Sequence, residues 1–218
     1  MIVCGIDEAG RGSVIGPLVV LGISIPEKDV SLLKDIGVRD SKSLSRKARE
    51  KLYQKILSLN VNVYEVVLDA SEVDRYLRRR SGPSINALEA NATTEIIRNL
   101  RPDVAYIDSP DVKPARYAER ILAMLDYSPR IVCEHKADSR YEVVAAASIL
   151  AKVRRDDMLT KLSEVYGDLG SGYSSDKRTI EFLVRCLRDK GEVPSCVRRG
   201  WKTVDKLLQA KLYGFGKE

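Results

Sequence analysis

The sequence predicts an α/β fold in which a five-stranded mixed sheet is flanked by helices and followed by a helical C-terminal extension. Short runs rich in β-branched residues alternate with segments whose apolar residues recur every three or four positions. Three strands come early in the chain and each later strand follows a helix, an order typical of a mixed sheet covered by helices. With 218 residues, of which 44% are apolar, the chain is long enough to bury a core.

Five strands are predicted from apolar runs bounded by turn residues, over 2–6, 14–25, 61–68, 104–108 and 130–135. Helices are predicted from apolar spacing, over 44–57, 83–100, 117–125 and a long segment that begins at Glu142. Two more helices, at 180–187 and 204–212, follow the glycine- and serine-rich stretch 167–176. We therefore divide the chain into a main domain over 1–165 and an extension over 166–218 that packs on the same domain.

Acidic residues stand at the ends of three predicted strands. Asp7 ends the first, Asp108 ends the fourth, and Asp138 comes shortly after the fifth, while Glu8 follows Asp7 directly. In an open α/β sheet that edge is where ligands bind. A single acid at a strand end is equally well explained as a turn-forming residue. Several carboxylates placed together, however, repel one another unless a cation neutralises them. The sequence therefore predicts a divalent metal site.

Oxygen ligands without cysteine or clustered histidine favour Mg²⁺ or Mn²⁺ over zinc. Successive strand residues point to opposite faces, so Asp7 and Glu8 cannot both face one ion while the strand stays regular. We expect Asp7 to be shared between two ions, and Glu8 either to leave the strand or to serve the second ion. Two ions perform phosphoryl transfer without a side-chain nucleophile, and His135 is the only histidine that could assist one.

The segment Gly5 to Gly12 reads G-x-x-x-x-G-R-G, a near miss to the phosphate loop of NTPases. Arg11 replaces its lysine, Gly12 replaces its hydroxyl, and a strand is predicted to follow, so an NTPase fits poorly. Gly10 and Gly12 allow backbone to approach a ligand closely, and Arg11 offers a cation to a phosphate. On the glycines alone, a tight turn between strands is the simpler interpretation.

Other residues suit a polyanionic partner, which the net charge of +6 permits. Lys42 and the basic clusters at 152–155 and 198–202 could contact a phosphate backbone. Tyr173 lies in the stretch GSGYSS, where an aromatic ring can stack on a sugar or base or can anchor the loop on the domain. No apolar run is long enough to span a bilayer and no signal peptide opens the chain, so we expect a cytoplasmic protein.

Six motifs resemble the ribonuclease HII family (type 2 ribonuclease H), and its single-domain archaeal form most of all. They are GIDEAGRG at 5–12, DSKSLS at 40–45, YIDSP at 106–110, EHKADSRYEVVAAASILAKVRRD at 134–156, GSGYSSD at 170–176 and RRGWKTV at 198–204. The motifs cover nearly the whole chain in the order of the family, which makes the set far more specific than any one of them.

The resemblance implies an RNase H-like fold, with the catalytic domain over 1–165. It implies hydrolysis of the RNA strand of RNA/DNA hybrids and incision on the 5′ side of ribonucleotides embedded in duplex DNA. Two ions of Mg²⁺ or Mn²⁺ would act in this reaction, which leaves 3′-hydroxyl and 5′-phosphate ends. The metal-binding carboxylates of the family fall on Asp7, Glu8, Asp108 and Asp138.

The resemblance also assigns the residues that bind the substrate. Gly10, Arg11 and Gly12 would contact the 2′-hydroxyl and adjacent phosphates, Tyr173 would pack on the next deoxyribose, and Lys42 would bind a phosphate. Ser13 and Ser174 stand where the family often has proline, which could loosen both loops. We expect a monomer, and a sliding clamp is a further candidate partner through the tail KLYGFGKE.

Two alternatives remain open at this stage. One is another nuclease of RNase H-like fold, such as a strand-transfer or junction-resolving enzyme, which shares the carboxylates but not the glycine-arginine-glycine motif with the tyrosine. The other is a nucleic-acid-binding module whose acids only cap helices, and such a module would take up no specific metal.

Overall fold

The computed structural model describes residues 1–39, 44–77 and 84–214, with side chains described up to residue 210. Its residues group into two compact units, each described by itself below. Unit 1 comprises Met1–Ala9, Val19–Val67 and Asn86–Arg154, and unit 2 comprises Gly10–Leu18, Leu68–Ile85 and Arg155–Glu218. The expected division of the chain after residue 165 stays a prediction.

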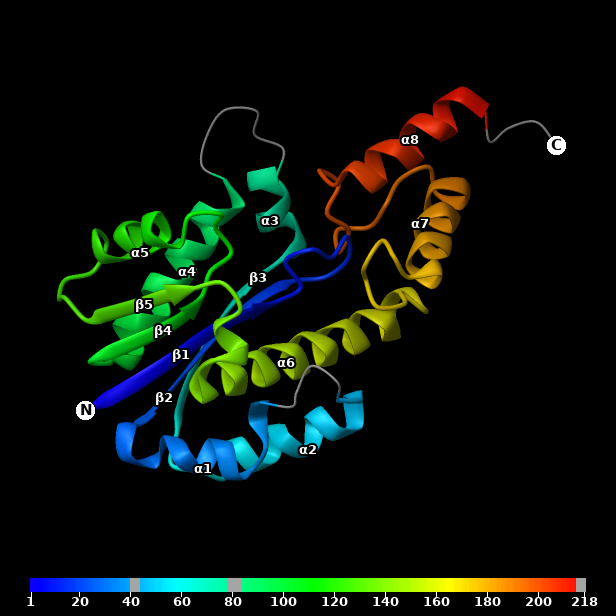
Figure 1. Ribbon diagram of the computed structural model, residues 1–218. Coiled ribbons are helices and arrows are strands. Elements are labelled where there is room, and N and C mark those ends of the chain that lie inside the picture. The colour runs from blue at the N-terminus through cyan, green and yellow to red at the C-terminus, as the bar shows by residue number, and fades with distance from the viewer. Residues whose placement is uncertain (40–43, 78–83, 215–218) are drawn as a thin grey trace. The chain divides into compact units, whose positions relative to one another are not determined.

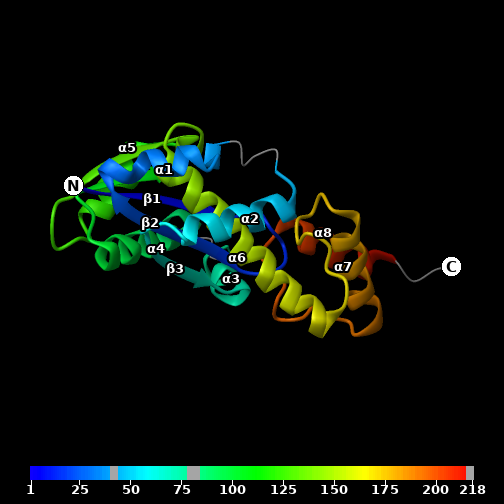
Figure 2. The ribbon, with the colours of Figure 1, turned by 90° about the horizontal axis from the view of Figure 1, so that it is seen from below.

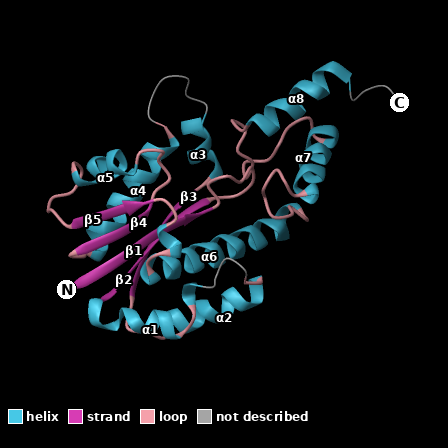
Figure 3. Ribbon diagram, viewed as in Figure 1, coloured by secondary structure: helices cyan, strands magenta, loops and turns pink. Residues whose placement is uncertain are grey.

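The sheet has the strand order β3-β2-β1-β4-β5 (Figure 3). These strands are β1 (Ile2–Ala9), β2 (Leu18–Pro26), β3 (Asn62–Leu68), β4 (Val104–Asp108) and β5 (Arg130–Glu134). β1 pairs with β2 in antiparallel and with β4 in parallel orientation, and β4 is parallel to β5. The predicted mixed five-stranded sheet is thus confirmed.

Two strand boundaries differ from the prediction by more than one residue. β1 continues past Ile6 to Ala9, so Asp7 and Glu8 both lie within the strand. β2 begins at Leu18 instead of Val14, because Gly16 takes a positive φ of 87° and Pro17 has no amide hydrogen for the ladder. Before that point, Ile15 makes only an isolated bridge to Val197.

The helices of unit 1 follow the predicted spacing closely. They are η1 (Glu27–Asp29), α1 (Val30–Asp35), α2 (Arg46–Leu57), α4 (Ile85–Leu100), α5 (Pro114–Leu122), η3 (Ala137–Ser139) and the first half of α6 (Glu142–Tyr166). Ser45 caps α2 by accepting a hydrogen bond from the amide of Ala48. The short helix α1 was not predicted, since it buries a single residue, Leu33, and so lacks a periodic pattern.

Two glycines let helices lie directly on the sheet. A Cβ at Gly5 would come 2.2 Å from the carbonyl carbon of Val143 on α6, and one at Gly22 would come 2.3 Å from Ile96 on α4. Gly22 is the cross-strand partner of Ile6, so it points to the face opposite to Gly5. Helices α4 and α6 therefore cover opposite faces of the sheet (Figures 1 and 2).

Unit 2 has a core of its own. It contains α3 (Ala70–Leu77), the second half of α6, α7 (Lys177–Asp189) and α8 (Lys202–Gly214). Val14, Leu159 and Phe182 are among the residues buried in that core. Asp176 caps α7 by accepting from the amide of Arg178. The two helices predicted beyond the glycine-rich stretch are present and somewhat longer than expected.

The four cysteines are free thiols. Cys4 is buried in unit 1 and Cys196 in unit 2, while Cys133 and Cys186 are half-buried. Burial raises the pKa of Cys196 to about 11 and that of Cys4 well above its usual range. Among the helices that the structure describes, none has the length and apolar character to cross a membrane.

Candidate active site

Asp7 points from β1 toward helix α6. It lies two residues after Gly5 and therefore on the same face of the strand, the one that contacts Val143. The hydroxyl of Ser148, one turn further along α6, donates a hydrogen bond to the Asp7 carboxylate. Lys152, another turn on, donates to Ser148 Oγ at 2.7 Å. Asp7 is only 7% exposed, and helix α6 contacts its carboxylate through Ser148.

Two more carboxylates join Asp7 through the topology of the sheet. The parallel register pairs Ile6 with Ile107, which places Asp108 beside Asp7. Asp138 comes from η3, directly after β5, and the amide of its neighbour Ala137 donates to Asp108 Oδ1 at 3.2 Å. One oxygen from each of Asp7, Asp108 and Asp138 lies within 4.8 Å of the other two. The strand-end acids thus converge as the sequence predicted.

The electrostatics of this cluster favour a bound cation. Burial, together with the charge of the neighbouring Asp108 carboxylate, raises the pKa of Asp7 to about 7. The hydroxyl of Ser148, the amide of Glu8 at 2.8 Å from Asp7 Oδ1 and the charge of Lys152 act in the opposite direction. Three converging carboxylates form an all-oxygen donor set, which suits a hard divalent ion.

Glu8 does not belong to this three-carboxylate cluster. It stays in β1, paired with Val20, and therefore points to the face opposite to Asp7. The sequence left two possibilities for Glu8, and the structure shows that Glu8 does not leave the strand. His135 is exposed and also lies outside the cluster.

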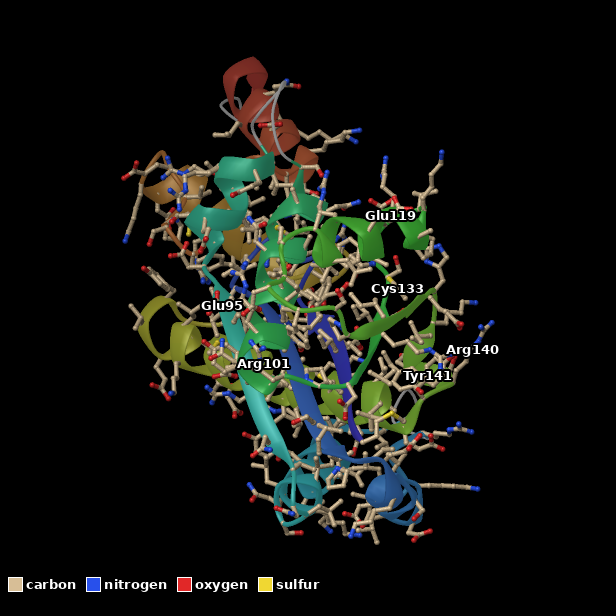
Figure 4. The ribbon with its side chains drawn as sticks, turned by 90° about the vertical axis from the view of Figure 1, so that its left-hand side faces the viewer. Glu95, Arg101, Glu119, Cys133, Arg140 and Tyr141 are labelled. Carbon is tan, nitrogen blue, oxygen red and sulfur yellow. The ribbon has the colours of Figure 1, made fainter. Side chains whose placement is uncertain are left out.

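The cluster is supported by an ion-pair network next to it on β5. Glu134 pairs with Arg140, and Tyr141 donates to Glu134 Oε1 at 3.3 Å, which ties the residues that follow Asp138 to the strand. Arg140 and Tyr141 are labelled in Figure 4. In the loop after β4, the buried Asp111 accepts from Arg116 at 2.7 Å and from the amide of Lys113. These bonds lower the pKa of Asp111 to about 2, so this acid is a structural one.

The glycine-arginine-glycine segment begins unit 2. Gly10 has a φ of 90°, and a Cβ there would lie 2.6 Å from the carbonyl oxygen of Pro17, so the turn requires glycine. Ser13 is fully buried and its hydroxyl donates to Gly10 O at 2.8 Å, so the serine is itself a part of the turn. Gly12 is exposed, and a Cβ built on it would lie 3.8 Å from the ring of Tyr173.

The loop of Tyr173 is fastened to the same segment. The carbonyl of Gly172 accepts hydrogen bonds from the amides of Val14, at 2.8 Å, and Ile15, at 3.1 Å. The guanidinium of Arg155 lies 4.9 Å from the centre of the Tyr173 ring and donates to Ser171 O at 2.7 Å. The structure therefore brings Gly10, Gly12 and Tyr173 close to one another around Arg155, and their role in substrate binding stays a prediction.

Two arginines of the predicted basic clusters are buried, which the sequence did not predict. Arg155 and Arg198 were expected in clusters facing phosphate, but they are 4% and 0% exposed. For Arg155 a signal existed, because it stands four residues from both Ala151 and Leu159 on the buried stripe of α6. Arg198 makes its contacts with residues near the other end of the chain, which sequence spacing cannot show.

Comparison with known proteins decides the family. The family model described as ribonuclease HII matches residues 4–204. The ribonuclease HII of Pyrococcus horikoshii is 45% identical over 209 residues, which are 95% of this chain and 93% of that protein. That of Methanocorpusculum labreanum is 43% identical over 208 residues, 95% of this chain and 94% of that protein. This chain belongs to the ribonuclease HII family.

Solved structures agree with that assignment. The crystal structure of the ribonuclease H2 from P. horikoshii OT3 superposes with a TM-score of 0.90 at 44% identity and covers 98% of this chain and 100% of that one. Bst-RNase HIII in complex with Mn²⁺ superposes with a TM-score of 0.82 at 26% identity, over 98% of this chain and 71% of that one. The RNase H-like fold is thereby confirmed, and the chain is a nuclease that acts on the RNA of hybrids.

In this member of the family, two predicted contacts fall outside the residues whose side chains the structure describes. Lys42 lies in the stretch 40–43, and the tail expected to bind a clamp begins at Lys211 and lies wholly beyond residue 210. The strand-end acids other than Glu8 converge in unit 1, and the glycine-arginine-glycine segment lies beside Tyr173 in unit 2.

Proposed function

We propose that this ribonuclease HII hydrolyses the RNA strand of RNA/DNA hybrids and incises duplex DNA on the 5′ side of embedded ribonucleotides, leaving 3′-hydroxyl and 5′-phosphate ends. The observation that carries the proposal is the convergence of Asp7, Asp108 and Asp138, with one oxygen of each within 4.8 Å of the others. Carboxylates gathered in this way can hold divalent ions, which suits a reaction in which water attacks a phosphodiester.

Asp7, Asp108 and Asp138 would hold Mg²⁺ or Mn²⁺, and Glu8 would contribute to a second ion from the opposite face of β1. When bound, two such ions supply a water of lowered pKa and stabilise the leaving 3′-oxygen. Ser148 and Lys152 favour the ionised form of Asp7 on the side away from the ligand. The solved complex of Bst-RNase HIII with Mn²⁺ supports divalent metal in a relative.

Selection of the cut would come from Gly10, Arg11, Gly12 and Tyr173. The exposed amide of Gly12 offers a hydrogen-bond donor to the 2′-hydroxyl, which is the group that distinguishes RNA from DNA. The Tyr173 ring, held over Arg155, offers an apolar face to the next sugar. Lys42 is proposed as a phosphate contact on its motif alone.

The test is a DNA duplex with a single ribonucleotide, incubated with Mg²⁺ or Mn²⁺ beside an all-DNA duplex of the same sequence. We expect one cut, 5′ to the ribose, whose 3′ end a polymerase can extend and whose 5′ end carries phosphate. Cleavage of the all-DNA duplex, or intact ribonucleotide duplex at saturating metal, would refute the proposal.

We also propose a sliding clamp as partner of a monomeric, cytoplasmic enzyme. A ribonuclease HII from Archaeoglobus fulgidus, 43% identical over 94% of this chain and 96% of that one with a TM-score of 0.84, was solved in complex with PCNA. The tail of this chain contains Tyr213 and Phe215. A chain that ends at residue 210 should lose binding to such a clamp and keep its cleavage rate; unchanged clamp binding would refute the role of the tail.

A further inference from the structure

The buried arginine of the last motif, Arg198, spans the loop that follows β1. Its side chain is fully buried, its Nε donates to Gly16 O at 3.1 Å, and its Nη1 donates to Arg11 O at 2.9 Å. One rigid guanidinium thus holds two carbonyl groups near the two ends of the segment Gly10–Leu18. The amide of Arg198 also donates to Val14 O, at 2.9 Å.

The bond to Arg11 O determines where the next amide points. A trans peptide is planar, and its carbonyl oxygen and amide hydrogen lie on opposite sides. When Arg198 fixes Arg11 O on the buried side, the amide hydrogen of Gly12 must face away from Arg198. Gly12 is exposed, and among the described residues its amide has no hydrogen-bond partner, so the donor is left available to a ligand.

Arg198 occupies its place at an energetic cost. Its two hydrogen-bonded nitrogens meet neutral carbonyls, and its Nη2 has no partner in the part of the chain that the structure describes. Burial and the charge of Arg155 lower the pKa of Arg198 to about 10, although Asp74 raises it. Stability alone does not explain a guanidinium here, because an apolar side chain of similar volume would avoid the desolvation.

We propose that Arg198 is a positioning residue, which holds the Arg11–Gly12 peptide so that the Gly12 amide is presented to the ribonucleotide. This inference rests on the proposed reading of the ribose by Gly10, Arg11 and Gly12. The loop of Tyr173 is held in the same manner, since Arg155 donates to Ser171 O. Both loops are therefore held by buried guanidinium groups through their backbone carbonyls.

The experiment compares Arg198→Met and Arg198→Lys with the matched control Arg188→Met, whose wild-type side chain is exposed on α7 and pairs with the exposed Asp189. On a duplex with one ribonucleotide we expect kcat/KM to fall about 10- to 100-fold in both Arg198 variants, mainly through KM. Arg198→Lys should not rescue, because an ammonium cannot span Gly16 O and Arg11 O as a fork does. The control should stay within about twofold of wild type.

Amide hydrogen exchange supplies a readout that is independent of substrate. The amides of Val14 and Ile15 bond Gly172 O, and that of Gly16 bonds Cys196 O. In Arg198→Met these amides should exchange at least about tenfold faster, while the amides of α7 and the affinity for Mn²⁺ stay unchanged. A general destabilisation would instead accelerate exchange throughout unit 2.

Each outcome decides between the claims. If wild type cuts the ribonucleotide duplex and Arg198→Met behaves as Arg188→Met does, the positioning role is wrong and the proposed function stands. If wild type does not cut, the proposed function is wrong, and the exchange data still report whether Arg198 orders the loop. If neither Arg198 variant folds, Arg198 maintains the unit as a whole and the positioning role is wrong.

Discussion

Asp7 is the residue at which its proposed catalytic role and the stability of the protein oppose each other. Its carboxylate is 7% exposed and lies against two other acids, so an empty site carries a charge that burial disfavours. For an acid whose pKa rises on folding from 3.8 to about 7, ionisation is easier in the unfolded chain. The free energy of unfolding of the metal-free protein therefore decreases as the pH rises from about 4 to above 7.

We predict that Asp7→Asn lowers cleavage at least about 100-fold and stabilises the metal-free protein. At pH 8 the variant should exceed wild type in the free energy of unfolding by on the order of 2 kcal/mol, and the gain should vanish near pH 4. Urea denaturation at both pH values measures this. Saturating Mg²⁺ should stabilise wild type but not the variant, and near-normal turnover by Asp7→Asn would contradict the assigned role.

At the scale of elements, helix α6 shapes the site because it lies directly on β1. Gly5 leaves no space for a side chain next to the backbone of Val143, so β1 and α6 are in direct contact there. This contact places Ser148 and Lys152 next to Asp7. The buried residues of the first half of α6 are mostly alanines and valines, which allow the close approach. The geometry of the metal ligands thus depends on how closely a helix and a strand pack.

Gly5→Ala should therefore impair both stability and metal binding. The added methyl group would meet backbone at 2.2 Å, so α6 must move, at a cost of about 3 kcal/mol. Calorimetric titration should show weaker Mn²⁺ binding at a temperature where the variant is folded. Gly37→Ala is the control: no atom lies within 4 Å of its Cβ, and only its φ of 84° opposes the change, which costs about 1 kcal/mol.

Lys152→Met should shift the acid limb of the activity profile to higher pH. The charge of Lys152 lowers the pKa of Asp7, so its removal makes Asp7 harder to ionise and metal harder to bind below neutral pH. At pH 6 we expect the Mn²⁺ concentration for half-maximal rate to rise several-fold, and at pH 9 the difference should shrink. Lys161→Met, an exposed position on the same helix, should leave the profile unchanged.

The sequence predicted these elements where a pattern is local. Apolar runs that end in acids located Asp7, Asp108 and Asp138, because the carboxyl ends of parallel strands share one edge. Contacts between distant segments could not be predicted from the sequence. Ser148 faces Asp7 only because α6 packs on Gly5, and Arg198 reaches Arg11 across most of the chain. Glu8 stayed ambiguous, because the extent of β1 depends on its pairing with β2.

For the molecule as a whole, the two tasks of the enzyme draw on different units. Asp7, Asp108 and Asp138 belong to unit 1, whereas Gly10–Gly12 and Tyr173 belong to unit 2. The residues proposed to hold metal and the residues proposed to select the ribonucleotide are each positioned by contacts within their own unit. Substitutions should therefore separate metal affinity from selectivity.

Tyr173→Ala tests this separation. We expect Mn²⁺ affinity to stay within about twofold of wild type, while the preference for a ribonucleotide followed by a deoxyribose falls about tenfold, since an aromatic stacking partner contributes about 1–3 kcal/mol. Titration calorimetry and cleavage of duplexes with one or two ribonucleotides measure the two quantities. Tyr173→Phe, which keeps the ring over Arg155, should retain the preference; loss of metal affinity in Tyr173→Ala would contradict the separation.

Two of the free thiols, Cys4 and Cys196, can report on the unfolding of the two units. Cys4 is buried in the core of unit 1 and Cys196 in that of unit 2, and the pKa of each is raised by burial. Neither thiol can react with an alkylating reagent until the structure around it opens. The two labelling rates in native buffer therefore show whether the units unfold as one cooperative body or one before the other, without any engineered probe.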